Sequence, residues 1–141
     1  MPSTPLQVVP RAKPADAEKI TINLGYVDLG QIDLLVAEGF YSNRTDLIRT
    51  AIRNQLATHN EAVKQAAARK TLVLGLQRFG VAELEAARTA GQPLDIRVLG
   101  LAVIAPDVSP ELALAAIQSV TVLGALQASA AVKAALAGRI H

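Results

Sequence analysis

The chain has 141 residues, of which 51% are hydrophobic but only 3% aromatic, and its formal net charge at pH 7 is +2. This hydrophobic content, with 18% charged residues, excludes an intrinsically disordered chain. The absence of cysteine excludes a disulfide framework and any thiolate-based metal or catalytic site. All four aromatic residues lie in the first 80 positions, whereas 16 of the 26 alanines lie in the last 61, so we expect two differently built parts.

Residues 1–17 are rich in Pro, Ala and charged residues, and they contain no apolar run long enough for a signal peptide. We therefore expect a flexible tail and a cytoplasmic protein. The longest uncharged stretch, residues 112–132, has the length of a membrane span, but polar side chains interrupt it. We interpret this stretch as a buried segment of a soluble domain and expect no membrane association.

The first predicted element is a strand at residues 19–24, where apolar and polar side chains alternate strictly and β-branched residues are frequent. Alternation of this kind is typical of a strand with one buried face. The apolar set is Ile20, Ile22 and Leu24, and the polar set is Lys19, Thr21 and Asn23.

Two helices are predicted to follow. Apolar residues at helical spacing run from Val27 to Glu38, and Gly39 stands where a glycine would end that helix. In the second helix Asn43 is a suitable N-cap, and Asp46 three residues later completes a pattern similar to a capping box. The apolar face of the second helix contains Leu47, Ile48, Ala51, Ile52 and Leu56.

A lone strand cannot satisfy its own backbone hydrogen-bonding groups. We therefore expect two chains to pair their strands antiparallel across a two-fold axis, with four helices covering one face of the ribbon. This predicts a homodimer formed through residues 18–58.

The strand KITINL, the helix that ends in EGFY and the segment SNRTDLIRTAIRNQL resemble the ribbon-helix-helix DNA-binding domain. This is the superfamily of the Arc and MetJ repressors, and the pattern is most similar to CopG-family regulators. The resemblance implies that the paired strands enter the major groove of double-stranded DNA, where the outward residues Lys19, Thr21 and Asn23 contact base edges. It also implies that the start of the second helix holds DNA phosphates through Ser42, Asn43, Arg44 and Thr45.

The same residues have simpler interpretations. The polar set of the strand would also suit a solvated face, and Asn43 would cap its helix without any DNA. Residues 19–58 carry four basic and four acidic side chains, so they lack the strong basic footprint of many DNA-binding domains. We expect modest non-specific affinity with a shallow salt dependence, Arg49 in a salt bridge within the dimer or on the surface, and Arg53 in solvent.

The second half of the chain contains an internal repeat after a helical connector at residues 59–70. The tripeptide Val-Leu-Gly occurs at 73–75, 98–100 and 122–124, so that its glycines are 25 and 24 residues apart. Each tripeptide lies in an apolar run and is followed by a segment with helical character, at 81–90, 109–119 and 129–140. This spacing predicts a three-unit βα repeat with parallel strands over residues 71–141, similar to leucine-rich-type solenoids.

The predicted fold class is therefore α+β, with an N-terminal β-α-α unit and a small βα-repeat domain. The alternative for the second half is an ordinary α+β domain in which the tripeptide matches arose by chance. Because a short repeat leaves strand edges unpaired, we expect residues 71–141 to mediate oligomerisation into a higher homo-oligomer, or partner docking.

Catalytic and metal-binding motifs are absent from the sequence. The only histidines, His59 and His141, have no carboxylate at metal-ligand spacing, and no phosphate-binding loop is present. Glu83 and Glu85 are interpreted as residues of a solvated helix face. We therefore expect no cofactor, no metal and no enzymatic activity.

The sequence thus predicts a sequence-specific DNA-binding protein, a transcriptional regulator associated with the nucleoid. Two alternatives stay open. In the first, the protein is an antitoxin that represses its own operon and neutralises a toxin through its second half. In the second, it is a structural scaffold in which residues 18–58 only dimerise and the repeat builds filaments or docks a partner.

Overall fold

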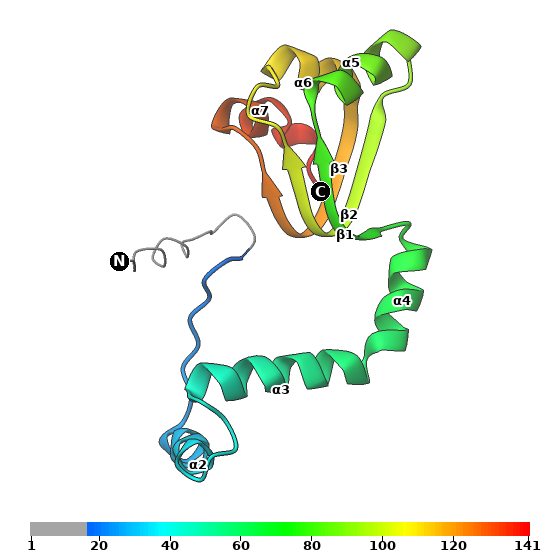
Figure 1. The fold of residues 1–141 in the computed structure, drawn as a ribbon. Coiled ribbons are helices and arrows are strands. Elements are labelled where there is room, and N and C mark those ends of the chain that lie inside the picture. Colours follow the sequence, from blue (N-terminus) through cyan, green and yellow to red (C-terminus); the bar gives the residue numbers. More distant parts are fainter. Residues whose placement is uncertain (1–16) are drawn as a thin grey trace, which may run out of the picture. The chain divides into compact units, whose positions relative to one another are not determined.

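The computed structural model describes residues 17–141, which fall into two compact units divided between Glu61 and Ala62. The tail predicted at residues 1–17 lies outside the described residues, apart from Ala17. The N-terminal unit contains the helices α2 (Tyr26–Ala37) and α3 (Arg44–Thr58). The C-terminal unit contains three strands with the helices that follow them, and α4 (Asn60–Arg69) begins at the division between the units (Figure 1).

Residues 17–25, which include the predicted strand, adopt neither a helix nor a hydrogen-bonded strand in the single chain. The predicted ribbon is intermolecular, so a single chain has no second strand with which this segment would pair. The segment leads into α2 through Gly25, whose backbone is extended. The strand at residues 19–24 therefore stays a prediction about two chains.

Helix α2 has the amphipathic face that its spacing predicts, since its half-buried apolar residues are Leu29, Ile32, Leu35 and Val36. The helix ends at Ala37, and Gly39, two residues later, has a φ of +90°. In this left-handed conformation the N–H of Phe40 donates to the carbonyl of Leu35 at 3.0 Å, which satisfies one of the last free carbonyls of the helix.

Three parallel strands form the single sheet of the C-terminal unit, in the order β1-β2-β3, which confirms the prediction of parallel strands. The strands are β1 (Val73–Phe79), β2 (Leu94–Ile104) and β3 (Ile117–Gln127). Helix α5 (Val81–Ala90) joins β1 to β2, α6 (Pro110–Ala116) joins β2 to β3, and α7 (Ala130–Ala135) follows β3 before a short 3-10 turn, Ala137–Arg139.

The three Val-Leu-Gly tripeptides lie side by side in the sheet, with Gly75 paired to Gly100 and Gly100 paired to Gly124. All three glycines have positive φ angles, between 122° and 140°. Strands β2 and β3 are strongly bent, so that each starts and ends on the side where the helices lie (Figure 1). The sheet is therefore a stack of bent strands crossed by a column of paired glycines.

The core lies between the two arms of the bent strands and the helices. In β2 the buried side chains occupy alternate positions on both sides of the glycine, at Ile96, Val98, Ala102 and Ile104. Leu84 of α5 and Val132 of α7 are fully buried against the same core. The uncharged stretch at residues 112–132 contributes to this core. It forms parts of α6, β3 and α7 rather than one continuous helix.

Two predicted helices differ from the structure. The helix expected at 109–119 ends at Ala116, because Ile117 already belongs to β3, where its fully buried side chain contributes to the core. The helix expected at 129–140 ends at Ala135 and gives way to the 3-10 turn. By contrast, α5 spans the predicted residues 81–90 and ends at Gly91, which has a φ of +68°.

Glu83 and Glu85 have more specific contacts than the solvated face predicted for them. The carboxylate of Glu83 accepts the N–H of Gly80 at 2.6 Å and so caps the start of α5. Glu85 is half-buried and forms an ion pair with Arg88, one turn along the same helix.

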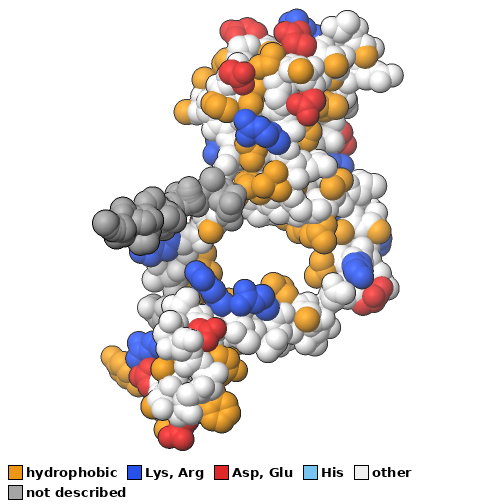
Figure 2. All heavy atoms as spheres, viewed as in Figure 1, with side chains coloured by type: hydrophobic (Ala, Val, Ile, Leu, Met, Phe, Trp, Pro, Cys, Tyr) orange, Lys and Arg blue, Asp and Glu red, His pale blue; other side chains and the backbone are white. Residues whose placement is uncertain are grey.

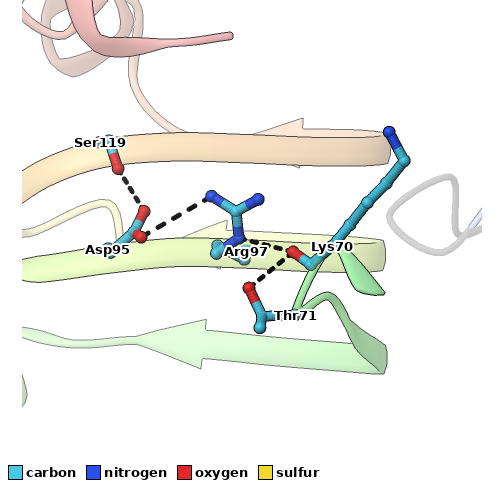
Figure 3. Close-up of polar contacts among 5 residues, drawn as sticks. All are labelled: Lys70, Thr71, Asp95, Arg97 and Ser119. Atoms are coloured by element: carbon cyan, nitrogen blue, oxygen red, sulfur yellow. Dashed lines mark hydrogen bonds and ion pairs between the residues drawn. The ribbon is translucent and has the colours of Figure 1, made fainter. Parts of the chain in front are cut away.

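A chain of polar contacts connects the end of α4 to the sheet (Figure 3). The guanidinium of Arg97 in β2 donates to the carbonyl of Lys70 at 2.8 Å, and the hydroxyl of Thr71 donates to the same carbonyl. Arg97 also lies 3.7 Å from the carboxylate of Asp95, which in turn accepts a hydrogen bond from Ser119 of β3. These contacts fix the point at which the chain enters the repeat.

Candidate nucleic-acid interface

The extended segment at residues 17–25 presents both of its side-chain sets to solvent in the single chain. Lys19, Thr21 and Asn23 are exposed, as a set that contacts DNA must be. The apolar residues between them are also exposed, by 72% at Ile20 and 58% at Ile22. Successive side chains of an extended chain point to opposite sides, so the segment has one polar and one apolar face, and the apolar face has no cover in its own unit.

The helices of the N-terminal unit leave further apolar surface open. No described residue of α2 or α3 is buried, and the exposed large side chains include Tyr26, Leu34, Phe40, Ile52 and Leu56. Exposed apolar surface of this extent marks an interaction site rather than a finished monomeric core.

The start of α3 is organised by Asn43, as the sequence predicts. The side-chain oxygen of Asn43 accepts the N–H of Asp46 at 2.8 Å. The reciprocal bond differs from a capping box, because the carboxylate of Asp46 accepts the N–H of Ser42 at 2.9 Å instead of that of Asn43. The N–H groups of Arg44 and Thr45, at the very start of the helix, have no intrahelical acceptor and stay available to an anion.

Arg44 differs from the other residues predicted to contact phosphate, because it is bound to α2. Its guanidinium donates two hydrogen bonds to the carboxylate of Asp33, at 2.8 and 2.9 Å. The hydrogen bond and charge of Arg44 lower the pKa of the Asp33 carboxyl, and the pair raises the pKa of Arg44. This exposed, bidentate pair fixes α3 to α2 and offsets the positive charge of Arg44.

Two arginines lie beside the start of α3. A shallow open cleft of about 410 Å³ is lined by Ser42, Asn43, Thr45, Asp46, Arg49 and Arg53. Basic side chains gather along one side of α3 (Figure 2). Among the described residues neither Arg49 nor Arg53 forms an ion pair, so the surface salt bridge expected for Arg49 is not present in the single chain.

The sequence contains a signal for this cleft. Thr45, Arg49 and Arg53 follow one another at intervals of four positions, and that spacing places side chains on one face of a helix. Arg53 is exposed, as expected, and Arg49 is exposed without the expected salt bridge; both line the cleft with Ser42 and Asn43. The cleft thus combines free backbone N–H groups, hydroxyl and amide groups and two cations with one carboxylate, that of Asp46. Apart from this carboxylate, which accepts the N–H of Ser42, its chemistry is suited to a phosphate.

Within residues 17–141 no group of His, Asp and Glu side chains is arranged to hold a metal ion. None of the helices described there has the length and hydropathy needed to cross a membrane.

Comparison with known proteins gives the class of this chain. The family model of the ribbon-helix-helix transcriptional regulators matches residues 15–133, which include most of both units. The chain therefore belongs to the ribbon-helix-helix transcriptional regulator family, as its N-terminal motifs indicate. Members of this family bind DNA, are typically dimeric and are typically not enzymes. The searches of curated proteins and of solved structures gave no match.

Proposed function

We propose that this protein is a sequence-specific transcriptional regulator that acts on double-stranded DNA as a dimer. In the dimer, residues 19–24 of two copies pair as an antiparallel ribbon that enters the major groove. The apolar faces of the two strands, with Ile20 and Ile22, are covered by the four helices. The polar face, with Lys19, Thr21 and Asn23, contacts base edges.

The observation that carries this proposal is the two-faced extended segment. In the single chain Ile20 and Ile22 are mostly exposed, although alternation gives the segment a complete apolar face. Leaving such side chains in water costs about 1.5–3 kcal/mol each relative to full burial. Pairing with a second chain satisfies the free backbone groups and covers the apolar face in one step.

Phosphate contacts are proposed at the start of α3, on both sides of the ribbon. Ser42, Asn43 and Thr45 act through side chains and backbone N–H groups, and Arg49 and Arg53 add positive charge from the adjacent helix face. Arg44 belongs to the same group, but its pairing with Asp33 leaves it less charge to offer a phosphate. The function of the C-terminal unit is to join copies into a higher assembly, and we expect the protein to act at the nucleoid.

Base contact is tested with the double variant Thr21→Ala/Asn23→Ala in the full chain. Each good base contact contributes about 1–3 kcal/mol of discrimination, so the affinity for a fragment selected from random duplexes is expected to fall at least tenfold. The variant should keep the mass of the parent in solution. Gln31→Ala on α2 is the control and should retain the fragment. Unchanged specific retention by the double variant would contradict base contact at these positions.

The phosphate contacts are tested separately through the salt dependence of DNA binding. The double variant Arg49→Gln/Arg53→Gln should weaken binding to all duplexes alike. The slope of log K against log salt should become shallower by about 0.9 for each phosphate that the variant no longer neutralises. A slope equal to that of the parent would exclude these two arginines from the interface.

A further inference from the structure

The first strand of the repeat has an open edge with a row of exposed apolar side chains. Leu74 is 71% exposed, Leu76 60% and Val73 46%, whereas Val98, the partner of Val73 in β2, is fully buried. The difference follows from position, since β2 has a strand on each side and β1 has a neighbour only in β2. The edge of β1 thus combines unpaired backbone groups with an apolar surface.

The opposite edge of the sheet is covered in part by the chain itself. Ile140 forms a parallel bridge with Val120 of β3, and the N–H of His141 donates to the carbonyl of Val120 at 2.8 Å. Arg139 holds this segment in place by donating to the carbonyls of Leu114 and Ile117, both at 2.7 Å. The C-terminal segment thus covers the first part of β3, at Val120.

The β1 edge has few of the usual protections against pairing. Its one charged residue is Arg78, near the end of the strand, whereas residues 73–77 include no charged side chain and no proline, and β1 contains no bulge in its pairing with β2. The first part of β1 is therefore an apolar edge suited to a partner.

The glycine of each strand leaves space for close approach of another backbone. A Cβ atom on Gly100 would lie 2.3 Å from the carbonyl oxygen of Gly75, and one on Gly124 would lie 2.0 Å from that of Gly100. In β2 and in β3 the Cβ position of the glycine therefore points towards the preceding strand of the sheet. Gly75 of β1 has a similar backbone conformation, with a φ of +125°, and no atom lies within 4 Å of its Cβ position. That position therefore points to where a strand preceding β1 would lie.

We propose that the occupant of this position is β1 of a second copy, paired antiparallel about a two-fold axis that passes beside Gly75. The sequence Leu74-Gly75-Leu76 is symmetric about its centre, so this pairing places Leu74 opposite Leu76 of the second copy and the two glycines opposite each other. The bent strands then continue as one stack, with their exposed leucines in contact across the axis.

A second copy is favoured over an unrelated partner for two reasons. The interface is self-complementary, as a two-fold contact requires. Members of the family are typically dimeric, and a dimer formed through the N-terminal unit holds two C-terminal units at high effective concentration. The inference rests on the proposed assembly role of this unit and adds the surface, the direction of the strands and their register.

The register is tested by cysteine cross-linking in the full chain, which has no cysteine of its own. Two versions of the full chain are co-expressed, one with Leu74→Cys and one with Leu76→Cys. The two versions differ in size, so that their covalent dimers can be told apart. Opposed residues in an antiparallel pair have Cβ atoms about 4.5–5.5 Å apart, close enough for a disulfide after a small adjustment. The mixed pair should therefore form a covalent dimer under mild oxidation.

Two controls define the outcome. Leu74→Cys alone should cross-link at least about tenfold more slowly, because two such residues lie on a diagonal about 7–8 Å long. Leu123→Cys should not cross-link, because this exposed leucine belongs to β3, which lies at the far edge of the sheet from the proposed axis. Equal rates for Leu74→Cys alone and for the mixed pair would overturn the antiparallel register. No cross-link in the mixed pair would overturn the interface itself.

Sedimentation of the parent protein separates this inference from the proposed assembly role. If the parent is larger than a dimer and the mixed pair does not cross-link, copies assemble through another surface and only the β1 interface is wrong. If the parent is a dimer and no cross-link forms, both the interface and the assembly role are wrong. A cross-link in a protein that sediments as a dimer supports the interface and places it within that dimer.

Discussion

The column of glycines makes a quantitative prediction about stability. In Gly100→Ala, the new Cβ would lie 2.3 Å from the carbonyl oxygen of Gly75. The contacted atom belongs to the backbone of a hydrogen-bonded strand, so it cannot rotate away as a side chain would. The residue would also have to keep a φ of +140°, a conformation that side chains rarely adopt.

These two effects differ in size and can be separated. Holding alanine in the unfavourable conformation costs about 1–3 kcal/mol. Relieving the overlap requires the paired strands to separate, which weakens the core beneath them, so we expect a total loss of about 4 kcal/mol or more in the free energy of unfolding. Gly91→Ala is the control, because its φ of +68° carries a conformational cost while nothing lies within 4 Å of its Cβ position and it lies outside the proposed β1 interface.

The measurement is urea unfolding of the full chain, followed by far-ultraviolet circular dichroism, with midpoints compared at equal slope. Gly100→Ala should lower the midpoint of the C-terminal unit clearly more than Gly91→Ala does. Equal losses would show that backbone conformation alone explains the glycines, and the close contact between strands would then have no energetic role.

Two further predictions concern the N-terminal unit. Asn43→Ala should lower the stability of that unit by about 1 kcal/mol and also weaken DNA retention, because it removes the cap of α3 beside the proposed phosphate contacts. Ser109→Ala removes the equivalent cap of α6, so it should cost similar stability without affecting DNA, and loss of DNA retention in this control would contradict the assignment. Asp33 has a pKa lowered from its ordinary value of 3.8, so its pairing with Arg44 stabilises the fold above that value and is lost as the pH falls through the lowered one. Titration of the Asp33 carboxyl by NMR should show this depressed pKa, and Arg44→Gln should return it towards 3.8.

The parallel strands could be predicted from the sequence because their signal is local and periodic. Glycines 25 and 24 residues apart, each inside an apolar run, predict parallel strands, and the sheet pairs those glycines. The bend of the strands could not be predicted in this way. A glycine in a strand is compatible with a bulge or a close approach as well as a bend, and only the stacking of three such glycines selects among them.

Helix ends were less predictable where the chain passes directly into another element. Ile117 continues the apolar spacing of α6, yet it begins β3, because burial in the sheet outweighs the weak helical preference of a β-branched residue. At the candidate site Asn43 was identified by its capping chemistry, whereas the pairing of Arg44 with Asp33 was not. These residues are eleven positions apart on different helices, and their contact depends on how the two helices pack.

The paired strands also restrict how the length of related chains can change. Along β1 and β2 the partners are 25 residues apart, and along most of β2 and β3 they are 24 apart, with one irregularity between Leu94 and Asp95. An insertion next to a glycine would shift every following pair and move core side chains to the outside. Insertions and deletions in homologous sequences should therefore lie in the helices and their loops, and the glycines should stay aligned with one another while the distance between them varies.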